Sequence, residues 1–143
     1  MPDPSLLDHR TRSSARQGRL YGGPVLAIAR AAERRYRRTI GAIFDDFDVL
    51  IAPTTAKPPP KIGAIKGLSE IGTDRVMVGA CPFAWPWNVL GWPGISVPSG
   101  FVDGLPVGTQ LLGPANSEPL LLSLAAELES ELRWFEQRPP GLI

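Results

Sequence analysis

One stretch decides how this chain folds: Asn88-Val-Leu-Gly-Trp-Pro-Gly-Ile-Ser-Val-Pro-Ser-Gly-Phe-Val-Asp-Gly-Leu-Pro-Val-Gly-Thr-Gln-Leu-Leu-Gly113. It contains two short β-type runs, Ile95 to Val97 and Val107 to Leu112, joined by glycines and prolines that force the backbone to turn. The pattern predicts two strands, and we expect the rest of the chain to pack onto them.

Two helices are predicted on either side of this stretch. From about Pro24 to Phe44, apolar residues recur every three or four positions, which is the spacing of one helix face. A second such stripe runs from Leu121 to Phe135, with Ser117 as the expected N-cap and Pro139-Pro140 as the expected stop. Packing into a core is the interpretation we favour for this leucine-rich stripe.

A third strand is predicted just after the first helix. Residues 49–52 form a continuous apolar run bounded by Pro53, which is typical of a strand buried on both faces. The proline-rich segment from Pro53 to Lys61 is expected to be a loop. Residues 62–78 predict irregular structure with a short helix near Thr73 to Val78. Together these elements indicate the α/β class, with a mixed sheet flanked by helices.

Length and composition exclude several classes of protein. The 143 residues suit one domain, and the net charge of +1 indicates neither a nucleic-acid nor a membrane partner. A membrane span needs a run of about 18 apolar residues, which the sequence lacks. The N-terminus has no apolar signal region, so a cytoplasmic location is expected. With one cysteine and one histidine, we expect no disulfide, metal or other cofactor.

The organisation predicted from these patterns is an arm followed by a domain. Residues 1–20 are polar and carry four arginines without an apolar period, so we expect a mobile basic arm. Residues 21–143 are expected to form the α/β part.

The arginines of residues 34–38 could bind phosphate, but a solvated helix face is the interpretation we favour. Residues 45–48 include three aspartates, for which turn formation is favoured over Mg²⁺ binding.

No catalytic group can be assigned from the residues. A nucleophilic hydrolase needs a Ser, Cys or Thr beside a base, and the sequence has no Gly-x-Ser-x-Gly motif. The only histidine, His9, lies in the arm, and Cys81 lacks an evident group to lower its pKa. The three lysines lie in the proline- and glycine-rich loop, where desolvation is not expected.

An aromatic segment before Asn88 is the best candidate for a pocket wall. Cys81-Pro-Phe-Ala-Trp-Pro-Trp-Asn88 places three aromatic side chains between prolines, and such density suits an apolar pocket. The residues predicted to contact substrate are Cys81, Phe83, Trp85 and Trp87.

The motif Asn88-x-x-Gly91-x-Pro93-x-x-Ser96-x-Pro98, followed by Gly104-Leu105-Pro106-x-Gly108-x-Gln110-Leu111, resembles the C-terminal part of the amidase signature family. The strand ending in Ala52-Pro53-Thr54 and the terminal leucine-rich helix occur in the same order in that family. The resemblance covers about residues 25–138. The residues that carry the structural motif are Pro53, Thr54, Asn88, Gly91, Pro93, Gly104, Pro106, Gly108 and Gln110.

The resemblance implies a large α/β hydrolase that cleaves amide C–N bonds with a serine, cis-serine and lysine triad. That triad lies in a Gly/Ser-rich segment upstream of the matched region, and residues 1–143 contain no counterpart. The resemblance also implies that the aromatic segment walls the acyl side of the substrate pocket. Family members often have Thr at the position of Ala84, and the amidotransferases of the family tend to have an acid near Cys81. A small apolar or aryl amide is therefore the expected substrate class.

The sequence thus predicts the scaffold and substrate-pocket portion of an amidase, inactive alone, whose partners are a small amide and a missing N-terminal catalytic segment. An alternative is a non-catalytic module or pseudoenzyme remnant that self-associates through exposed strand edges. A third hypothesis, RNA or phosphate binding through Arg34 to Arg38, would give steep salt dependence.

Overall fold

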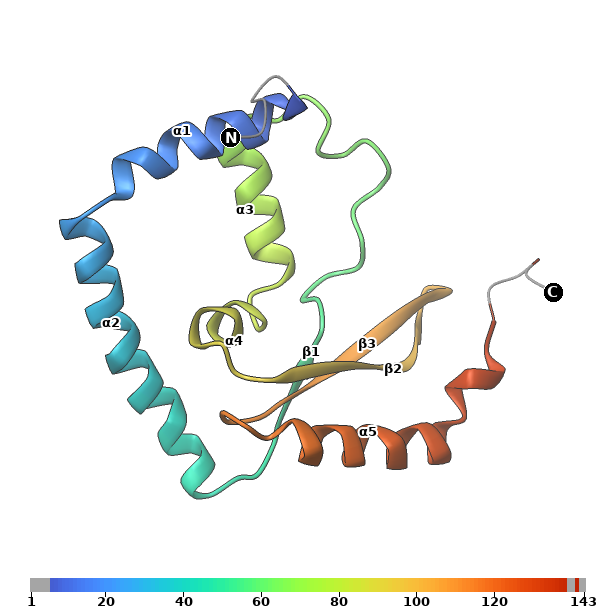
Figure 1. The fold of residues 1–143 in the computed structure, drawn as a ribbon. Coiled ribbons are helices and arrows are strands. Elements are labelled where there is room, and N and C mark those ends of the chain that lie inside the picture. Colours follow the sequence, from blue (N-terminus) through green and yellow to red (C-terminus); the bar gives the residue numbers. More distant parts are fainter. Residues whose placement is uncertain (1–5, 139–140, 142–143) are drawn as a thin grey trace. The chain divides into compact units, whose positions relative to one another are not determined.

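The computed structural model describes residues 6–138 and residue 141. The chain divides into two compact units, residues 1–39 and residues 40–143. Figure 1 shows the helices and strands in chain order. They are α1 (His9–Gly18), a 3-10 helix (Arg19–Tyr21), α2 (Pro24–Gly41), a 3-10 helix (Ala42–Asp45), β1 (Leu50–Pro53), α3 (Glu70–Ala80), α4 (Trp85–Leu90), β2 (Gly94–Val102), β3 (Leu105–Leu112), α5 (Glu118–Leu132) and a 3-10 helix (Trp134–Glu136).

The first unit contains a helix, α1, inside the segment for which no helical pattern was found. Asp8 caps it: its Oδ1 accepts hydrogen bonds from the backbone N–H groups of Arg10 at 2.8 Å and Thr11 at 3.2 Å. Such a cap satisfies donors that have no partner within the first turn of a helix. The mobility of this arm and its boundary at residue 20 stay predictions.

Helix α2 confirms the helix predicted from Pro24, and the 3-10 helix that follows extends it to Asp45. Its polar side carries an ion pair between Glu33 and Arg37, and Arg30 also forms an ion pair with Glu33; each N–O distance is 3.3 Å. None of its residues is buried. The helix is therefore amphipathic in sequence, but its apolar side chains Val25 and Ile28 remain exposed.

The second unit is built on a three-stranded sheet with the strand order β1-β3-β2. Both pairings are antiparallel, and Leu112 of β3 lies opposite Leu50 of β1 and Gly94 of β2. Strands combined with helices confirm the predicted α/β class. Parallel pairing, which a mixed sheet also contains, is not seen among the strands that the structure describes.

Strand β1 differs from the prediction in its burial. Residues 49–52 were expected to be buried on both faces, yet Ile51 is 71% exposed. The reason is that only one face of β1 is covered in this chain, and the side chain of Ile51 belongs to the other face. The residues of β1 alternate between half-buried and exposed, as expected for a strand covered on one face.

Strand β2 is longer than the sequence predicted. Pro98 was expected to end it, but the strand continues to Val102. The structure accommodates the missing N–H because β2 is also an edge strand and its register with β3 shifts between Pro98 and Gly100. Proline is tolerated at edges and at such bulges.

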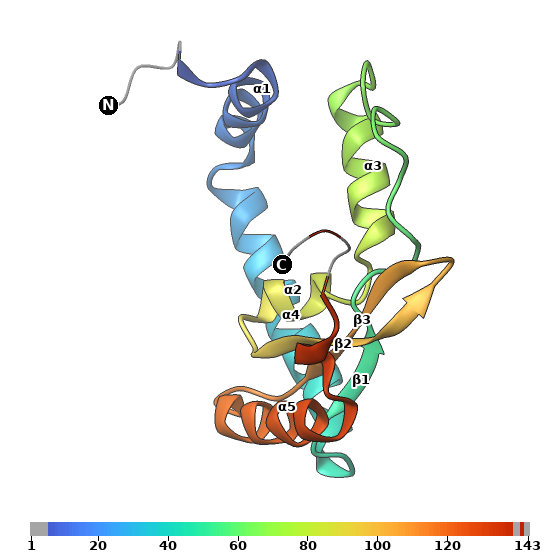
Figure 2. The ribbon, with the colours of Figure 1, turned by 90° about the vertical axis from the view of Figure 1, so that its right-hand side faces the viewer.

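Helix α5 lies along one face of the sheet (Figures 1 and 2). The core between them consists of four buried residues: Val97, Leu111, Leu121 and Ala125. The first half of the predicted leucine stripe is therefore buried, whereas Phe135, at its far end, is exposed. The helix ends at Leu132 because Arg133 adopts a left-handed conformation, well before Pro139-Pro140, which lie outside the described residues.

Two helices occupy the region for which only loops and a short helix were predicted. Helix α3 is longer than the predicted Thr73 to Val78, and Ser69 caps it by accepting a hydrogen bond from Gly72 N at 3.1 Å. Helix α4 was not predicted, because Pro82 precedes its sequence and Pro86 interrupts it. Pro86 is tolerated because it lies in the first turn. Gly91 ends α4 in a left-handed conformation, with φ of 65°.

Candidate functional site

Helix α4 presents the aromatic segment, and one of its residues anchors the helix to the sheet. Trp87 is only 8% exposed, and its indole N–H donates to the carbonyl oxygen of Gly113 at 2.8 Å. Phe44 and Trp92 contact it edge-to-face, with ring centroids between 5.9 and 6.3 Å apart in the three pairs. This aromatic cluster fixes α4 against the end of β3.

The four residues predicted to contact substrate fall into two groups. Phe83 and Trp85 are 41% and 51% exposed, so their rings are accessible. Cys81 is half-buried at the C-terminal end of α3, and Trp87 is packed in the aromatic cluster. The structure thus gives Trp87 a packing role and leaves Phe83 and Trp85 open to a ligand. Substrate contact by any of the four stays a prediction.

The predicted motif residues meet on the sheet, close to the end of β1. The hydroxyl oxygens of Thr54 and Ser96 lie 2.6 Å apart, and each would lie 2.9 Å from a β-carbon placed on Gly108. Gln110 is buried, and its Nε2 donates to the carbonyl oxygen of Pro53 at 3.2 Å. These bonds tie β1 and the residue after it to the other two strands. The role of Ser96 was missed, because it could be classified from the sequence only as a strand residue.

The other motif residues shape the backbone around the hairpin. Gly104 has φ of 76°, with no atom near its missing β-carbon, so it is the backbone conformation that requires glycine. Pro93 accepts a hydrogen bond from Gly113 N at 3.1 Å, and Pro106 lies opposite Phe101. Asn88 lies exposed in α4.

The ionisable groups show no arrangement for acid–base or metal chemistry among the described residues. No group of three or more His, Cys, Asp or Glu side chains there could hold a metal ion. Lys57, Lys61 and Lys66 are exposed. A hydrogen bond from Arg133 to Glu136 raises the pKa of Arg133, but this is a surface ion pair. No helix in the described part of the chain is long and apolar enough to cross a membrane.

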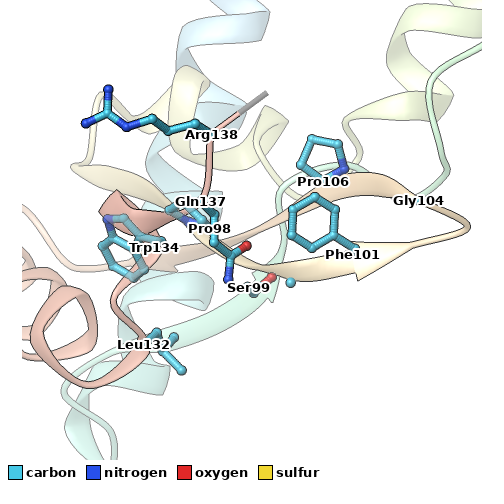
Figure 3. Close-up of a pocket in the computed structure, with 10 residues that line it drawn as sticks. Pro98, Ser99, Phe101, Gly104, Pro106, Leu132, Trp134, Gln137 and Arg138 are labelled. Atoms are coloured by element: carbon cyan, nitrogen blue, oxygen red, sulfur yellow. The ribbon is translucent and has the colours of Figure 1, made fainter. Parts of the chain in front are cut away.

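A cavity of about 440 Å³ lies between the β2–β3 hairpin and the segment after α5 (Figure 3). The lining side chains include apolar residues of the hairpin and of the C-terminal segment, together with Ser99, Gln137 and Arg138. The sequence analysis did not find this cavity, since its walls come from segments far apart in the chain that meet only in the fold. None of the four predicted substrate residues lines it.

A second cavity, also of about 440 Å³, lies beside β1. Its lining includes Ile51 and Val107 and the beginning of the proline-rich loop up to Pro59. The residues predicted to contact substrate do not line this cavity either. Of the predicted wall, Phe83 and Trp85 are exposed at the surface of this chain.

The geometry above is that of a scaffold: two edge strands tied across a third, an aromatic anchor, and an exposed aromatic surface. Residues 2–122 match the family model described as Amidase, so the chain belongs to the amidase family. Both the motif and the fold of this part of the chain agree with that membership.

Particular relatives share this portion of the family. The chain is 52% identical over 138 residues to "Putative amidase AmiA2" of Mycobacterium tuberculosis, covering 96% of this chain and 28% of that protein. It is 39% identical over 137 residues to "Putative amidase AmiB2" of the same organism, covering 95% of this chain and 30% of that protein.

Among solved structures, the chain resembles 6-aminohexanoate cyclic dimer hydrolase, with a TM-score of 0.82 and 27% sequence identity. The match covers 96% of this chain and 30% of that hydrolase. The chain therefore spans less than a third of the length of these relatives.

Proposed function

We propose that this chain is the C-terminal scaffold and substrate-pocket portion of an amidase-type hydrolase that cleaves carboxylic amide C–N bonds. The observation that carries the proposal is the match of nearly the whole chain, 96%, to under a third of a solved hydrolase, at a TM-score of 0.82. The serine, cis-serine and lysine triad implied by the resemblance would come from another segment, so the chain alone is proposed to be inactive.

Within that enzyme, the exposed rings of Phe83 and Trp85 would form part of the wall beside the substrate's acyl group. Their exposure in this chain supports the assignment, because a pocket wall needs apolar surface free to contact a ligand. Cys81 and Trp87 complete the proposed wall, with Trp87 also holding α4 against the sheet. The segment lacks the acid that the amidotransferases of the family tend to have near Cys81, and it has Ala84 where family members often have Thr. A small apolar or aryl amide is therefore the proposed substrate.

A chimera tests the proposal. In it, this chain replaces the matching 138 residues of "Putative amidase AmiA2", to which it is 52% identical. We expect the chimera to hydrolyse aliphatic or aryl amides that unaltered AmiA2 hydrolyses, whereas this chain alone shows no turnover. The control is AmiA2 carried through the same expression and amide panel. Turnover by this chain alone would contradict its proposed inactivity. A chimera that melts cooperatively but is inactive beside an active control would overturn the scaffold role.

The second candidate function is a non-catalytic module that self-associates. The observation in its favour is the edge strand β1, whose Ile51 is exposed beside an unpaired row of backbone groups. Light scattering distinguishes the two candidates. A monodisperse monomer argues against association through this edge. A dimer that the substitution Ile51→Lys converts to a monomer would support it.

A further inference from the structure

We propose that the cavity between the β2–β3 hairpin and the segment after α5 binds a small neutral aryl amide. In this arrangement the ring of the ligand lies between Phe101 and Trp134, and the amide group of the ligand pairs with the side-chain amide of Gln137. Every residue in the argument belongs to this chain, so the proposal does not depend on the proposed hydrolase function.

The size and apolar lining of the cavity suit a one-ring ligand. Its volume of about 440 Å³ lies within the range of roughly 300–1,000 Å³ that is typical of small-molecule sites. Phe101 and Trp134 come from opposite walls and lie on either side of the hollow (Figure 3). Phe101 is 57% exposed, so covering its ring with a ligand would remove apolar surface from water. The remaining apolar lining comes from Pro98, Pro106 and Leu132.

Two polar side chains converge inside the cavity and define the head group of the ligand. The amide of Gln137 points into the hollow toward Ser99 (Figure 3). The hydroxyl of Ser99 donates to the carbonyl oxygen of Val107 at 3.3 Å, so its oxygen keeps lone pairs that can accept a hydrogen bond. Gln137 offers both a donor and an acceptor, and a carboxamide presents the complementary pair.

The charge near the cavity favours a neutral head group over a carboxylate. Arg138 belongs to the lining, but its guanidinium group points away from the hollow and from Ser99 (Figure 3). A carboxylate inside the cavity would therefore lie beside the amide of Gln137 and the hydroxyl of Ser99, and the guanidinium group of Arg138 would not point toward it. Desolvating a carboxylate under those conditions costs much more than desolvating an amide.

Both walls are held in place by the fold itself. Trp134 is half-buried and packs against the core formed by α5 and the sheet. On the opposite side, the shift in register between Pro98 and Gly100 turns the hairpin, and Gly100 has φ of 120°, which favours glycine. A preformed site of this kind avoids the entropic cost of ordering its walls on binding.

The test is an NMR titration of the isotopically labelled 143-residue chain with benzamide and, separately, with benzoate. We expect benzamide to shift the indole signal of Trp134 and the side-chain amide signals of Gln137, and benzoate to bind more weakly. Gln137→Leu should weaken benzamide binding about tenfold by removing the paired hydrogen bonds. Phe101→Ala should weaken it by a similar factor. Both side chains are exposed, so both variants should fold.

The matched control is Phe47→Ala, since Phe47 is 60% exposed and does not line the cavity. Its benzamide affinity should equal that of the unaltered chain. Benzamide that leaves the Trp134 and Gln137 signals unmoved would overturn the proposal. Benzoate that binds as tightly as benzamide, and loses affinity in Arg138→Gln, would also overturn it, because the site would then recognise an anion.

Discussion

The hydroxyl oxygens of Thr54 and Ser96 lie 2.6 Å apart, although 42 positions separate the residues in the chain. Thr54 follows β1 and Ser96 lies on β2, and these strands are not neighbours, because β3 runs between them. The two side chains meet where β3 has Gly108, whose carbonyl also accepts a hydrogen bond from Thr54 N at 2.9 Å. The absence of a side chain at Gly108 therefore allows the two edge strands to be joined.

The substitution Gly108→Ala should destabilise the chain. Its β-carbon would lie 2.9 Å from both hydroxyl oxygens and 3.4 Å from the β-carbon of Thr54, which is closer than side chains normally approach. Overpacking of this kind costs about 1–3 kcal/mol of unfolding free energy. Urea denaturation followed by circular dichroism measures the change.

The control for this substitution is Gly79→Ala. Gly79 lies in α3 with open space around its missing β-carbon, so alanine should stabilise the helix by about 0.5–1 kcal/mol. Ser96→Ala removes one of the two oxygens that the new methyl group meets. Gly108→Ala should consequently cost less in a Ser96→Ala background. Equal costs in the two backgrounds would show that the contact with the Ser96 hydroxyl does not cause the effect.

Trp87→Phe should cost about 1–3 kcal/mol of unfolding free energy. The phenyl ring keeps the edge-to-face contacts with Phe44 and Trp92 possible, but the indole N–H is lost. The carbonyl of Gly113 then stays buried without its 2.8 Å partner, and an unsatisfied buried acceptor carries a penalty of that size. Chemical denaturation measures it.

Trp85→Phe is the matched control for the tryptophan anchor, because Trp85 is 51% exposed on the same helix. It should change stability by less than about 0.5 kcal/mol. If both tryptophan variants lose the same stability, the loss reflects helix α4 as a whole and not the bond to Gly113.

The strands and long helices could be predicted because their signals are local. The apolar run ending at Ala52 and the run from Val107 to Leu112 each form a strand, and the periodic stripe from Pro24 forms a helix. Helices α1 and α3 were missed or shortened for a different reason. Each of these helices begins at a single capping residue, Asp8 or Ser69. The residues that follow do not show a strong helical spacing of apolar side chains.

The candidate site was less accessible to sequence reasoning, because its contacts join distant segments. The high density of aromatic residues made Trp87 a candidate site residue. Only the fold shows that its indole N–H donates a hydrogen bond to the carbonyl oxygen of Gly113, 26 positions away. The cavity between Phe101 and Trp134 depends on how α5 ends, which the left-handed conformation of Arg133 decides. The spacing of the apolar residues predicted a longer helix that stops at Pro139-Pro140, because nothing in that spacing indicates that the helix ends before Arg133.

Thr73→Val should leave the stability unchanged or raise it by about 1 kcal/mol. Thr73 is buried in α3, and its hydroxyl oxygen has no hydrogen-bond partner in the described part of the chain. Valine keeps the shape and removes the penalty of a buried unpaired hydroxyl. The melting temperature reports the change, with Thr73→Ser as control, since serine keeps the hydroxyl. A loss of stability in Thr73→Val would indicate that the hydroxyl is bonded.

In the turn of the hairpin, two substitutions of Gly104 should differ in how much unfolding free energy they cost. Asp103 and Gly104 both have positive φ, 51° and 76°, as the two central residues of a tight type I′ hairpin turn require. Gly104→Ala should cost about 1–2 kcal/mol, because a β-carbon disfavours that conformation. Gly104→Asn should cost less, since asparagine tolerates it. Neither side chain would meet a neighbouring atom at its β-carbon, so equal costs in urea denaturation would mean that backbone conformation is not what selects glycine here.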